Sequence, residues 1–189
     1  MKNNSYNLFF RTGIFQFCFV AVLLISCKDQ SIHSQTITIP MEQNQSSSNP
    51  YYSRTDTTHL EVTDAEWKKV LPDSIYQIAR NKGTERAFTG KYWDYEGLGT
   101  YFCAACGNTL FRSDSKFGSS CGWPSFYEAL RPNSVKYHED NAYGMSRIEV
   151  VCGRCDGHLG HIFDDGPPPT GKRFCMNSLM LDFEEDKAK

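Results

Sequence analysis

The sequence predicts a mainly β domain of antiparallel strands, preceded by two short helices and by an export segment. Between residues 99 and 183, short stretches rich in aromatic and β-branched residues alternate with Gly, Asn and Asp turns, which is typical of antiparallel strands. Helix-capping and helical-periodicity signals lie before that region. At 189 residues, the chain has the length of one domain with additional segments, and its net charge of −2 does not favour nucleic-acid binding.

The first 26 residues have the features of an export signal. A positively charged start precedes IFQFCFVAVLLI, an apolar run shorter than the about 20 residues that a membrane-spanning helix needs. The run ends in LISC, which resembles the lipobox of bacterial lipoproteins. We expect residues 1–26 to be a lipoprotein-type signal peptide and Cys27 to carry lipid, which would anchor the chain to a membrane of the bacterial cell envelope, outside the cytoplasm. Ordinary cleavage near Ser34 and an uncleaved anchor are the alternatives.

The remaining chain divides into a tether, a domain and a tail. Residues 27–53 are rich in Ser, Gln, Asn and Thr and show no sustained apolar period, so we predict a flexible tether there. The folded domain is placed at residues 54–183. The last residues, 184–189, form a short polar tail.

Two short helices are predicted at the start of the domain. Thr63 and Glu66 form a capping-box pattern ahead of Trp67, so a helix is expected to begin there. After Pro72, apolar residues recur at helical spacing, and Gly83 is expected to end this second helix.

Five stretches after the helices are predicted to contain strands. They are GTYFC, TLFRS, SVKYHE, SRIEVV and RFCMNSLMLDF, in chain order. Asp140 and Asn141 suit a hairpin turn between the third and fourth stretches.

Four of the eight cysteines form two Cys-x-x-Cys pairs. Cys103 with Cys106 and Cys152 with Cys155 each end a predicted strand and precede a Gly or Asp-Gly turn. Together they supply the four thiolates that tetrahedral zinc prefers, and such a site leaves no open position, so we predict one structural zinc ion. Because an exported chain meets oxidising conditions, disulfides are an alternative, as are a redox-active pair and iron in the same sulfur site.

Cys121 and Cys175 have no Cys-x-x-Cys partner, and buried, inert thiols are one interpretation of them. Their neighbours argue against it. Strand alternation puts Arg173, Cys175 and Asn177 on one face, where a guanidinium favours the reactive thiolate and an amide can bind a polar ligand. Cys121 lies in SSCGWPSF beside Trp123, whose alternative role is that of a core aromatic residue.

A third polar cluster, HLGHIFDDG, follows the second Cys-x-x-Cys pair. It holds His158 and His161, three residues apart, with Asp164 and Asp165 behind them. Considered alone, this cluster indicates either a second metal site or two histidines that stabilise a turn.

Together, CGWPSF, HLGHIFDDG and RFCMNS, in this order and with two zinc-type Cys-x-x-Cys pairs, resemble the methionine-R-sulfoxide reductase B family. The similarity covers about residues 53–183. It implies two antiparallel sheets with short N-terminal helices, and a zinc site in many members. It also implies an enzyme, an oxidoreductase that reduces the R epimer of methionine sulfoxide in proteins or peptides.

The resemblance also implies the roles of the reacting residues. Cys175 matches the catalytic cysteine, which attacks the sulfoxide and becomes a sulfenic acid. Cys121 matches the resolving cysteine, which then forms a disulfide with Cys175. His161 and His158 match the catalytic histidines near the sulfoxide oxygen, with His161 the favoured acid.

Substrate-binding roles follow in the same way. Trp123 matches the aromatic wall for the S-methyl group, and Asn177 matches a polar residue near the oxygen. Arg173 and Asp165 match supporting positions, where Asp165 is a better match than Asp164.

The resemblance implies a thioredoxin-like reductant and no organic cofactor. From the net charge we expect no nucleic-acid partner, and we expect a monomer. Two other functions stay open: a general thiol–disulfide oxidoreductase, and a zinc-stabilised peptide-binding module. The first of these leaves Trp123 and the two histidines without a role.

Overall fold

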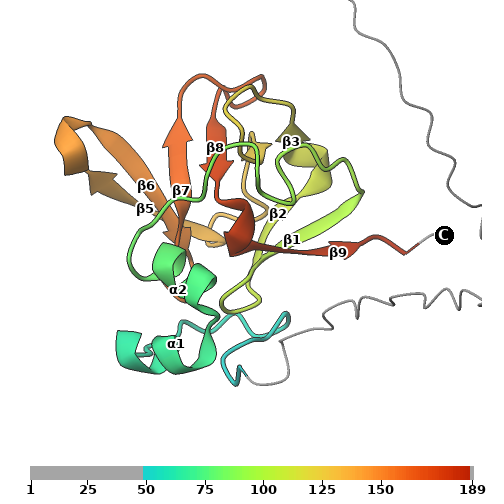
Figure 1. The fold of residues 1–189 in the computed structure, drawn as a ribbon. Helices are drawn as coiled ribbons and strands as arrows, with labels where there is room; N and C mark the ends of the chain where they lie inside the picture. Colours follow the sequence, from blue (N-terminus) through green and yellow to red (C-terminus); the bar gives the residue numbers. More distant parts are fainter. Residues whose placement is uncertain (1–48, 188–189) are drawn as a thin grey trace, which may run out of the picture. The chain divides into compact units, whose positions relative to one another are not determined.

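The computed structural model describes residues 49–187 of the chain. The predicted signal peptide, the predicted lipidation at Cys27 and the tether up to residue 48 lie outside the described residues. Two short helices lie beside two antiparallel sheets (Figure 1), which confirms the predicted fold class. Among residues 49–187, no helix is long and apolar enough to cross a membrane.

Helix α1 (Asp64–Val70) begins at the predicted capping box. The Thr63 hydroxyl accepts the backbone N–H of Glu66, and the Glu66 carboxylate accepts the backbone N–H of Thr63. Trp67 is buried and packs edge-on against Tyr51, with ring centroids 5.1 Å apart. The helix therefore fixes the start of the described chain through an aromatic contact.

Helix α2 (Asp73–Ala79) begins after Pro72, as predicted, but ends before Gly83. Lys82, the residue before Gly83, adopts the left-handed conformation, with φ 54°. The backbone N–H of Gly83 donates to the carbonyl of Gln77 and closes the end of the helix.

The strands form a three-stranded sheet, ordered β2-β1-β9, and a six-stranded sheet, ordered β3-β4-β8-β7-β6-β5 (labelled in Figure 1). Every pairing is antiparallel. The strands of the smaller sheet are β1 (Gly99–Cys103), β2 (Thr109–Arg112) and β9 (Leu181–Glu185). The strands of the larger sheet are β3 (Lys116–Phe117), β4 (Ser125–Phe126), β5 (Val135–Asp140), β6 (Arg147–Cys152), β7 (His158–Phe163) and β8 (Arg173–Met176).

Strand β7 lies inside the larger sheet, but its residues are not among the five stretches predicted to contain strands. A β-bulge explains the difference, because Val150 pairs with Gly160 whereas Val151 pairs with His158. Leu159 is the extra residue, so the alternation of inward and outward side chains breaks inside the motif. The regular alternation of residues that would indicate a strand is therefore missing from this motif.

Both ends of the domain extend past the boundaries predicted from composition. Asn49, in the range assigned to the tether, donates its side-chain N–H to the carbonyl of Ala105, and the backbone N–H of Ser53 donates to Cys106. At the other end, strand β9 continues to Glu185, within the range assigned to the tail. Polar composition concealed these contacts because the partners are backbone groups of distant residues.

An aromatic core joins the two sheets. Phe111 of β2 stacks on Phe126 of β4 with centroids 4.3 Å apart, and Tyr101 of β1 packs edge-on against Phe126 at 5.0 Å. All three side chains are fully buried. Burial of such large rings is a main stabilising contribution in a small β domain.

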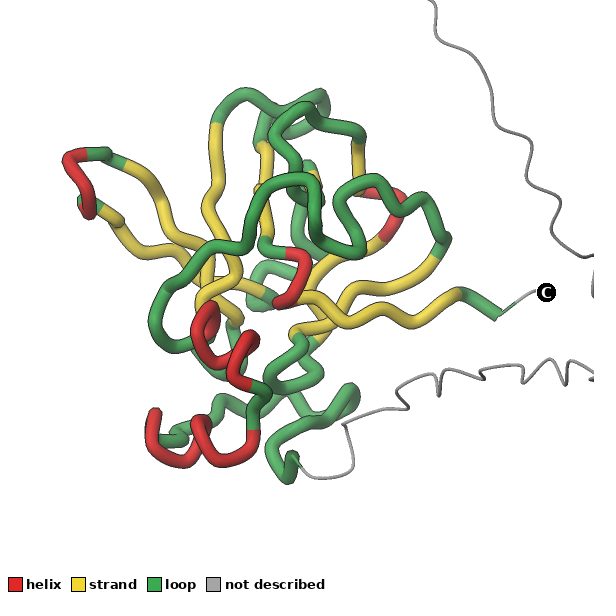
Figure 2. The backbone as a smooth tube through the Cα atoms, viewed as in Figure 1, coloured by secondary structure: helices red, strands yellow, loops and turns green. Residues whose placement is uncertain are grey.

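The connection from α2 to β1, residues 80–98, crosses in front of β7 and β8 (Figure 2). Two of the hydrogen bonds that attach this segment are made by its backbone N–H groups to residues outside the strands. The backbone N–H of Tyr92 donates to the Ser178 hydroxyl at 2.8 Å, and that of Phe88 donates to the Gly122 carbonyl at 2.8 Å. This crossing segment, residues 80–98, covers one face of the larger sheet.

Candidate active site and metal centre

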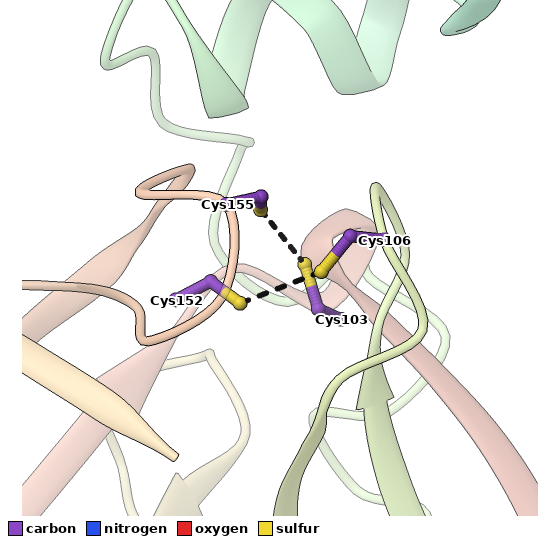
Figure 3. Close-up of side chains that lie close together, drawn as sticks. All are labelled: Cys103, Cys106, Cys152 and Cys155. Atoms are coloured by element: carbon purple, nitrogen blue, oxygen red, sulfur yellow. Dashed lines mark hydrogen bonds between the residues drawn. The ribbon is translucent and has the colours of Figure 1, made fainter. Parts of the chain in front are cut away.

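The four paired cysteines meet between the two sheets (Figure 3). Cys103 ends β1 and Cys152 ends β6, and a tight turn carries the second cysteine of each pair back toward the first. These turns are closed by left-handed residues, Gly107 with φ 78° and Asp156 with φ 55°. The two strand ends thus bring together residues that lie almost fifty positions apart in the chain.

The geometry of this four-cysteine cluster fits a tetrahedral metal ion. All four sulfurs lie within 4.8 Å of one another and are buried. The Sγ–Sγ distances are 3.8 Å for Cys103 and Cys155, and 3.6 Å for Cys106 and Cys152 (Figure 3). Sulfurs at about 2.3 Å from a central zinc define tetrahedron edges of about 3.8 Å, whereas a disulfide needs about 2.05 Å. The cluster could therefore hold one metal ion.

Strand register places a row of polar residues on one face of the larger sheet. Cys175 of β8 pairs with Ser125 of β4 on one side and with His161 of β7 on the other. His161 in turn pairs with Glu149 of β6. Because directly paired residues point to the same face, these four side chains lie side by side across four strands.

Cys121 approaches this row from its loop. Its Sγ lies 3.5 Å from the Sγ of Cys175, and it accepts the Ser119 hydroxyl at 2.8 Å. Gly122 next to it has φ 87°, and a Cβ there would lie 2.9 Å from side-chain atoms of Ala87 and Phe88 in the crossing segment. The loop geometry therefore depends on glycine and brings two cysteines together that are 54 residues apart.

The two thiols differ in their ease of ionisation. Burial opposes ionisation of Cys121, but hydrogen bonds from Ser119 and Ser125 outweigh it and bring the pKa of Cys121 to about 7. Burial and the adjacent sulfur of Cys121 raise the pKa of Cys175 to about 12, against the opposing effect of the Arg173 guanidinium. Because two charges at this distance repel strongly, the reduced pair carries at most one negative charge near neutral pH, and these pKa values place it on Cys121.

Cys175 also borders a pocket of about 130 Å³. Its lining includes Trp123, Arg147, His161, Phe163 and Asn177. This volume suits the end of a side chain, and it is smaller than the pockets of about 300 Å³ or more that hold drug-sized ligands. Cys175 thus lies between the pocket and the sulfur of Cys121.

The crossing segment positions two walls of this pocket through one residue. The backbone carbonyl of Glu85 accepts a hydrogen bond from the Trp123 indole N–H at 3.2 Å. The backbone N–H of Glu85 donates to the Asn177 side-chain oxygen at 3.0 Å. The Asn177 amide also donates to the Leu159 carbonyl at 3.0 Å and is buried. Asn177 therefore bridges β7 to the crossing segment as well as lining the pocket.

The two predicted histidines occupy different positions. His161 lines the pocket, whereas His158 is buried behind it and their ring centroids are 5.4 Å apart. The bulge turns both rings to the same face. A Cβ at Gly160 between them would lie 2.1 Å from the Cys175 carbonyl oxygen, so β7 and β8 approach closely here only because this residue is glycine.

Each histidine binds a carboxylate that the sequence analysis did not select. His158 Nδ1 lies 2.8 Å from the Glu149 carboxylate, and His161 Nε2 lies 2.7 Å from the Asp140 carboxylate. Glu149 follows an apolar residue in SRIEVV and is buried, so a charged residue inside a strand was the signal that could have revealed it. For Asp140, the sequence indicated only a position in a hairpin turn.

Arg173 lies close enough to act on the Cys175 thiol and bonds Asp165, and neither Arg173 nor Asp165 lines the pocket. The Asp165 carboxylate accepts two hydrogen bonds from the Arg173 guanidinium, at 2.8 and 2.9 Å. The guanidinium also lies over the Phe163 ring, 4.4 Å from its centroid. The structure therefore brings every predicted site residue of the domain into two places, the four-cysteine cluster and the surroundings of Cys175.

Comparison with known proteins agrees with this geometry. A family model described as the SelR domain matches residues 71–185. Peptide methionine sulfoxide reductase MsrB of Herminiimonas arsenicoxydans is 54% identical over 122 residues, which cover 65% of this chain and 89% of the relative. The protein of the same description from Thiobacillus denitrificans is 56% identical over 121 residues, or 64% of this chain and 92% of the relative. That of Methanosarcina mazei is 53% identical over 132 residues, or 69% and 94%.

The family model covers more than half of the chain, and these relatives are matched over most of their own length. The motifs that carried the resemblance all lie inside the matched region. The chain therefore belongs to the methionine-R-sulfoxide reductase B family and is an oxidoreductase.

Proposed function

We propose that the domain reduces the R epimer of methionine sulfoxide in peptides and proteins by thiol chemistry at Cys175. One observation carries this proposal. Cys175 lies between a pocket lined by Trp123 and His161 and the sulfur of Cys121, which is 3.5 Å away. A nucleophile with a substrate pocket on one side and a second thiol on the other suits a reaction in which the nucleophile is oxidised and then regenerated.

In the first step, the sulfur of Cys175 attacks the sulfoxide sulfur, and the sulfoxide oxygen is transferred to Cys175. Thiol plus sulfoxide gives sulfenic acid plus methionine, so the proton that leaves Cys175 balances the one that the oxygen gains. Because the pKa of Cys175 is about 12 in the reduced pair, we expect its ionisation to accompany protonation of the oxygen. His161 is the acid in this proposal, and His158 supports it from behind.

The substrate is oriented by the walls of the pocket. The Trp123 ring, held by its bond to Glu85, contacts the S-methyl group. His161 and Asn177 also line the pocket, and in this proposal they contact the oxygen. Fixing the methyl group and the oxygen on different walls selects one hand at the sulfur, which is the physical basis of epimer choice.

In the second step, the Cys121 thiolate attacks the sulfenic sulfur and forms a Cys121–Cys175 disulfide, and the hydroxide that leaves takes up a proton from solvent to become water. The sulfurs must close from 3.5 Å to the about 2.05 Å of a disulfide bond. A pKa of about 7 keeps much of Cys121 ionised at neutral pH. A thioredoxin-like dithiol then supplies two electrons and restores both thiols, so the cycle uses no organic cofactor.

Arg173 and Asp165 have a supporting role in this proposal. The Asp165 carboxylate holds the Arg173 guanidinium beside Cys175 through two hydrogen bonds. Arg173 favours the anionic form of Cys175, as the direction of its effect on the pKa of that thiol indicates. The pair therefore stabilises negative charge on the attacking sulfur.

We also propose that the four-cysteine cluster binds one structural zinc ion. Its residues are Cys103, Cys106, Cys152 and Cys155. A bound ion would cross-link the end of β1 to the end of β6 and supply stability rather than a reacting position. The Asn108 amide, 3.5 Å from the Cys152 sulfur, would donate to one ligand.

We propose further that Cys27 carries lipid and holds the catalytic domain at a membrane of the cell envelope, as a monomer. The support is the LISC sequence at the end of the apolar run. Replacing Cys27 with Ala should release the protein into the soluble fraction of the source cells. Membrane retention of that variant would contradict lipid anchoring at this residue.

The reaction is tested with separated epimers of a methionine sulfoxide peptide. Protein is incubated with each epimer and a thioredoxin reducing system, and methionine is quantified by chromatography. We expect turnover of the R epimer alone. Equal turnover of both epimers, or disulfide exchange without methionine formation, would favour a general thiol–disulfide oxidoreductase, and peptide binding without either would favour a binding module.

A further inference from the structure

The carboxylate of Asp140 is bonded on both oxygens. Its Oδ2 lies 2.7 Å from His161 Nε2 and accepts an Arg147 N–H at 2.5 Å. Its Oδ1 accepts the backbone N–H of Ala142 at 3.0 Å. Asp140 ends β5 and Arg147 begins β6, so both lie at the base of the turn that joins these two strands into a hairpin (Figure 1). The hairpin is thereby attached to a histidine of the pocket.

These contacts keep Asp140 ionised. The Ala142 N–H, the His161 ring and the Arg147 guanidinium together hold the pKa of Asp140 well below its usual range. An ionised carboxylate has only acceptor sites, so the nitrogen that faces it must carry a hydrogen. His161 is therefore protonated on Nε2, whether its ring is neutral or charged.

This assignment leaves Nδ1 as the nitrogen of His161 that can gain and lose a proton. The ring lines the pocket and pairs across the strands with Cys175, while its side chain is only 13% exposed. A histidine that reacts through one nitrogen needs its other nitrogen fixed, because rotation or tautomer exchange would remove the reacting atom.

We propose that Asp140 is a positioning residue for sulfoxide reduction, which fixes His161 with the proton on Nε2 so that Nδ1 delivers the proton to the sulfoxide oxygen. The inference rests on the proposed function. In the reaction, a proton passes from Nδ1 to the oxygen while the Nε2–H stays hydrogen-bonded to Asp140, and the ring changes from imidazolium to neutral imidazole. The ring then regains a proton on Nδ1, which balances the one that Cys175 releases. Arg147, which also lines the pocket, holds the carboxylate in place.

The other histidine supplies a comparison within the same sheet. His158 Nδ1 bonds Glu149, whose second oxygen accepts the Lys82 ammonium at 2.7 Å. The pattern of imidazole, carboxylate and cation is the same, yet His158 is absent from the pocket lining. Of the two carboxylates, Asp140 is therefore the one that can influence the reaction, because the histidine that it holds, His161, lies beside Cys175.

Asp140→Asn is the informative variant, since Asn keeps the shape and an oxygen for the Ala142 N–H. With its NH₂ group at the position of Oδ2, the amide faces both His161 and the Arg147 N–H, so the bond to Arg147 is lost, Nε2 becomes an acceptor and the proton moves to Nδ1. We expect the rate of methionine formation in the first turnover to fall by about 10²-fold, with a smaller change in KM. Glu128→Gln removes the same charge at an exposed residue beside the opposite face of the sheet and is the matched control.

The tautomer is read from ¹⁵N signals of the His161 ring, which a merely structural role would not move. We expect a proton on Nε2 in the wild type and on Nδ1 in Asp140→Asn. An unprotonated Nε2 in the wild type would overturn the proposal even if the variant failed to fold. So would a variant with wild-type rate, or one whose rate falls with the tautomer unchanged. If the wild type and Glu128→Gln both leave the R epimer unreduced, the proposed function fails instead.

Discussion

The six cysteines of the described domain divide into two groups with similar spacing and different surroundings. In the four-cysteine cluster, the closest sulfurs are 3.6 and 3.8 Å apart, and Cys121 and Cys175 are 3.5 Å apart. The cluster is buried between two strand ends and has one nearby amide. The pair has hydroxyls on one side, a guanidinium beside it and a pocket in front.

Distance between sulfurs therefore does not decide what a pair of cysteines does. Four buried sulfurs that face one another offer a tetrahedral site and no access for a substrate. Two partly exposed sulfurs with unequal pKa values offer a nucleophile and a second thiol to regenerate it. Substitutions in the two groups should have separable effects.

The largest effect is expected for Cys175→Ser. Loss of the nucleophile should lower first-turnover methionine formation by more than about 10⁴-fold, because Cys175 is the only cysteine of residues 49–187 that lines the pocket. Metal content and thermal stability should match the wild type. Residual activity close to the wild type would show that another group attacks the sulfoxide.

Cys103→Ala addresses the other group. If the cluster binds zinc, this variant should lose the metal and about 4 kcal/mol or more of unfolding free energy. Metal analysis and denaturant unfolding measure the two effects, and Cys121→Ala is the control that should keep the metal. A wild-type protein that binds no metal, or whose four cluster cysteines form disulfides, would contradict the zinc proposal.

Cys121→Ser should separate the two steps of the cycle. We expect a first turnover close to the wild-type rate, followed by a stop, because the sulfenic acid on Cys175 has no resolving thiol. A sulfenic-acid probe followed by mass spectrometry should label Cys175. Sustained turnover with the thioredoxin system would show that Cys121 is dispensable.

The smallest effect concerns pH. With a pKa of about 7, Cys121 gains thiolate as pH rises through neutrality, whereas Cys175 with a pKa of about 12 does not. Alkylation of the reduced protein should therefore occur first at Cys121, with a rate that increases with pH and levels off above about 8. Peptide mapping after limited alkylation at several pH values measures this, and earlier labelling of Cys175 would reverse the assignment.

Much of the fold could be predicted because its signals are local. The capping box of Thr63 and Glu66 lies within one turn of helix, and the Cys-x-x-Cys pairs end strands rich in aromatic residues. The strand β7 escaped prediction because the bulge at Leu159 breaks its period. Two histidines and a glycine in one stretch also weakened the strand signal.

The site was only half predictable for a physical reason. Cys175, Cys121 and the histidines belong to motifs whose chemistry shows in the residue types. The roles of Asp140 and Glu149 arise from strand register, which pairs Asp140 with Arg147 and Glu149 with His161. Register depends on pairing between segments, so a single sequence showed Asp140 as a turn residue alone.

The separation of the two groups is tested most directly by mapping disulfides after reaction with the R epimer. Reduced, metal-loaded protein is incubated with the R epimer in the absence of reductant, and peptides are analysed by mass spectrometry. We predict one disulfide, between Cys121 and Cys175, with the metal still bound and the other four cysteines unmodified. A disulfide that includes Cys103, Cys106, Cys152 or Cys155, or release of the metal as methionine forms, would contradict the division into a structural and a reactive group.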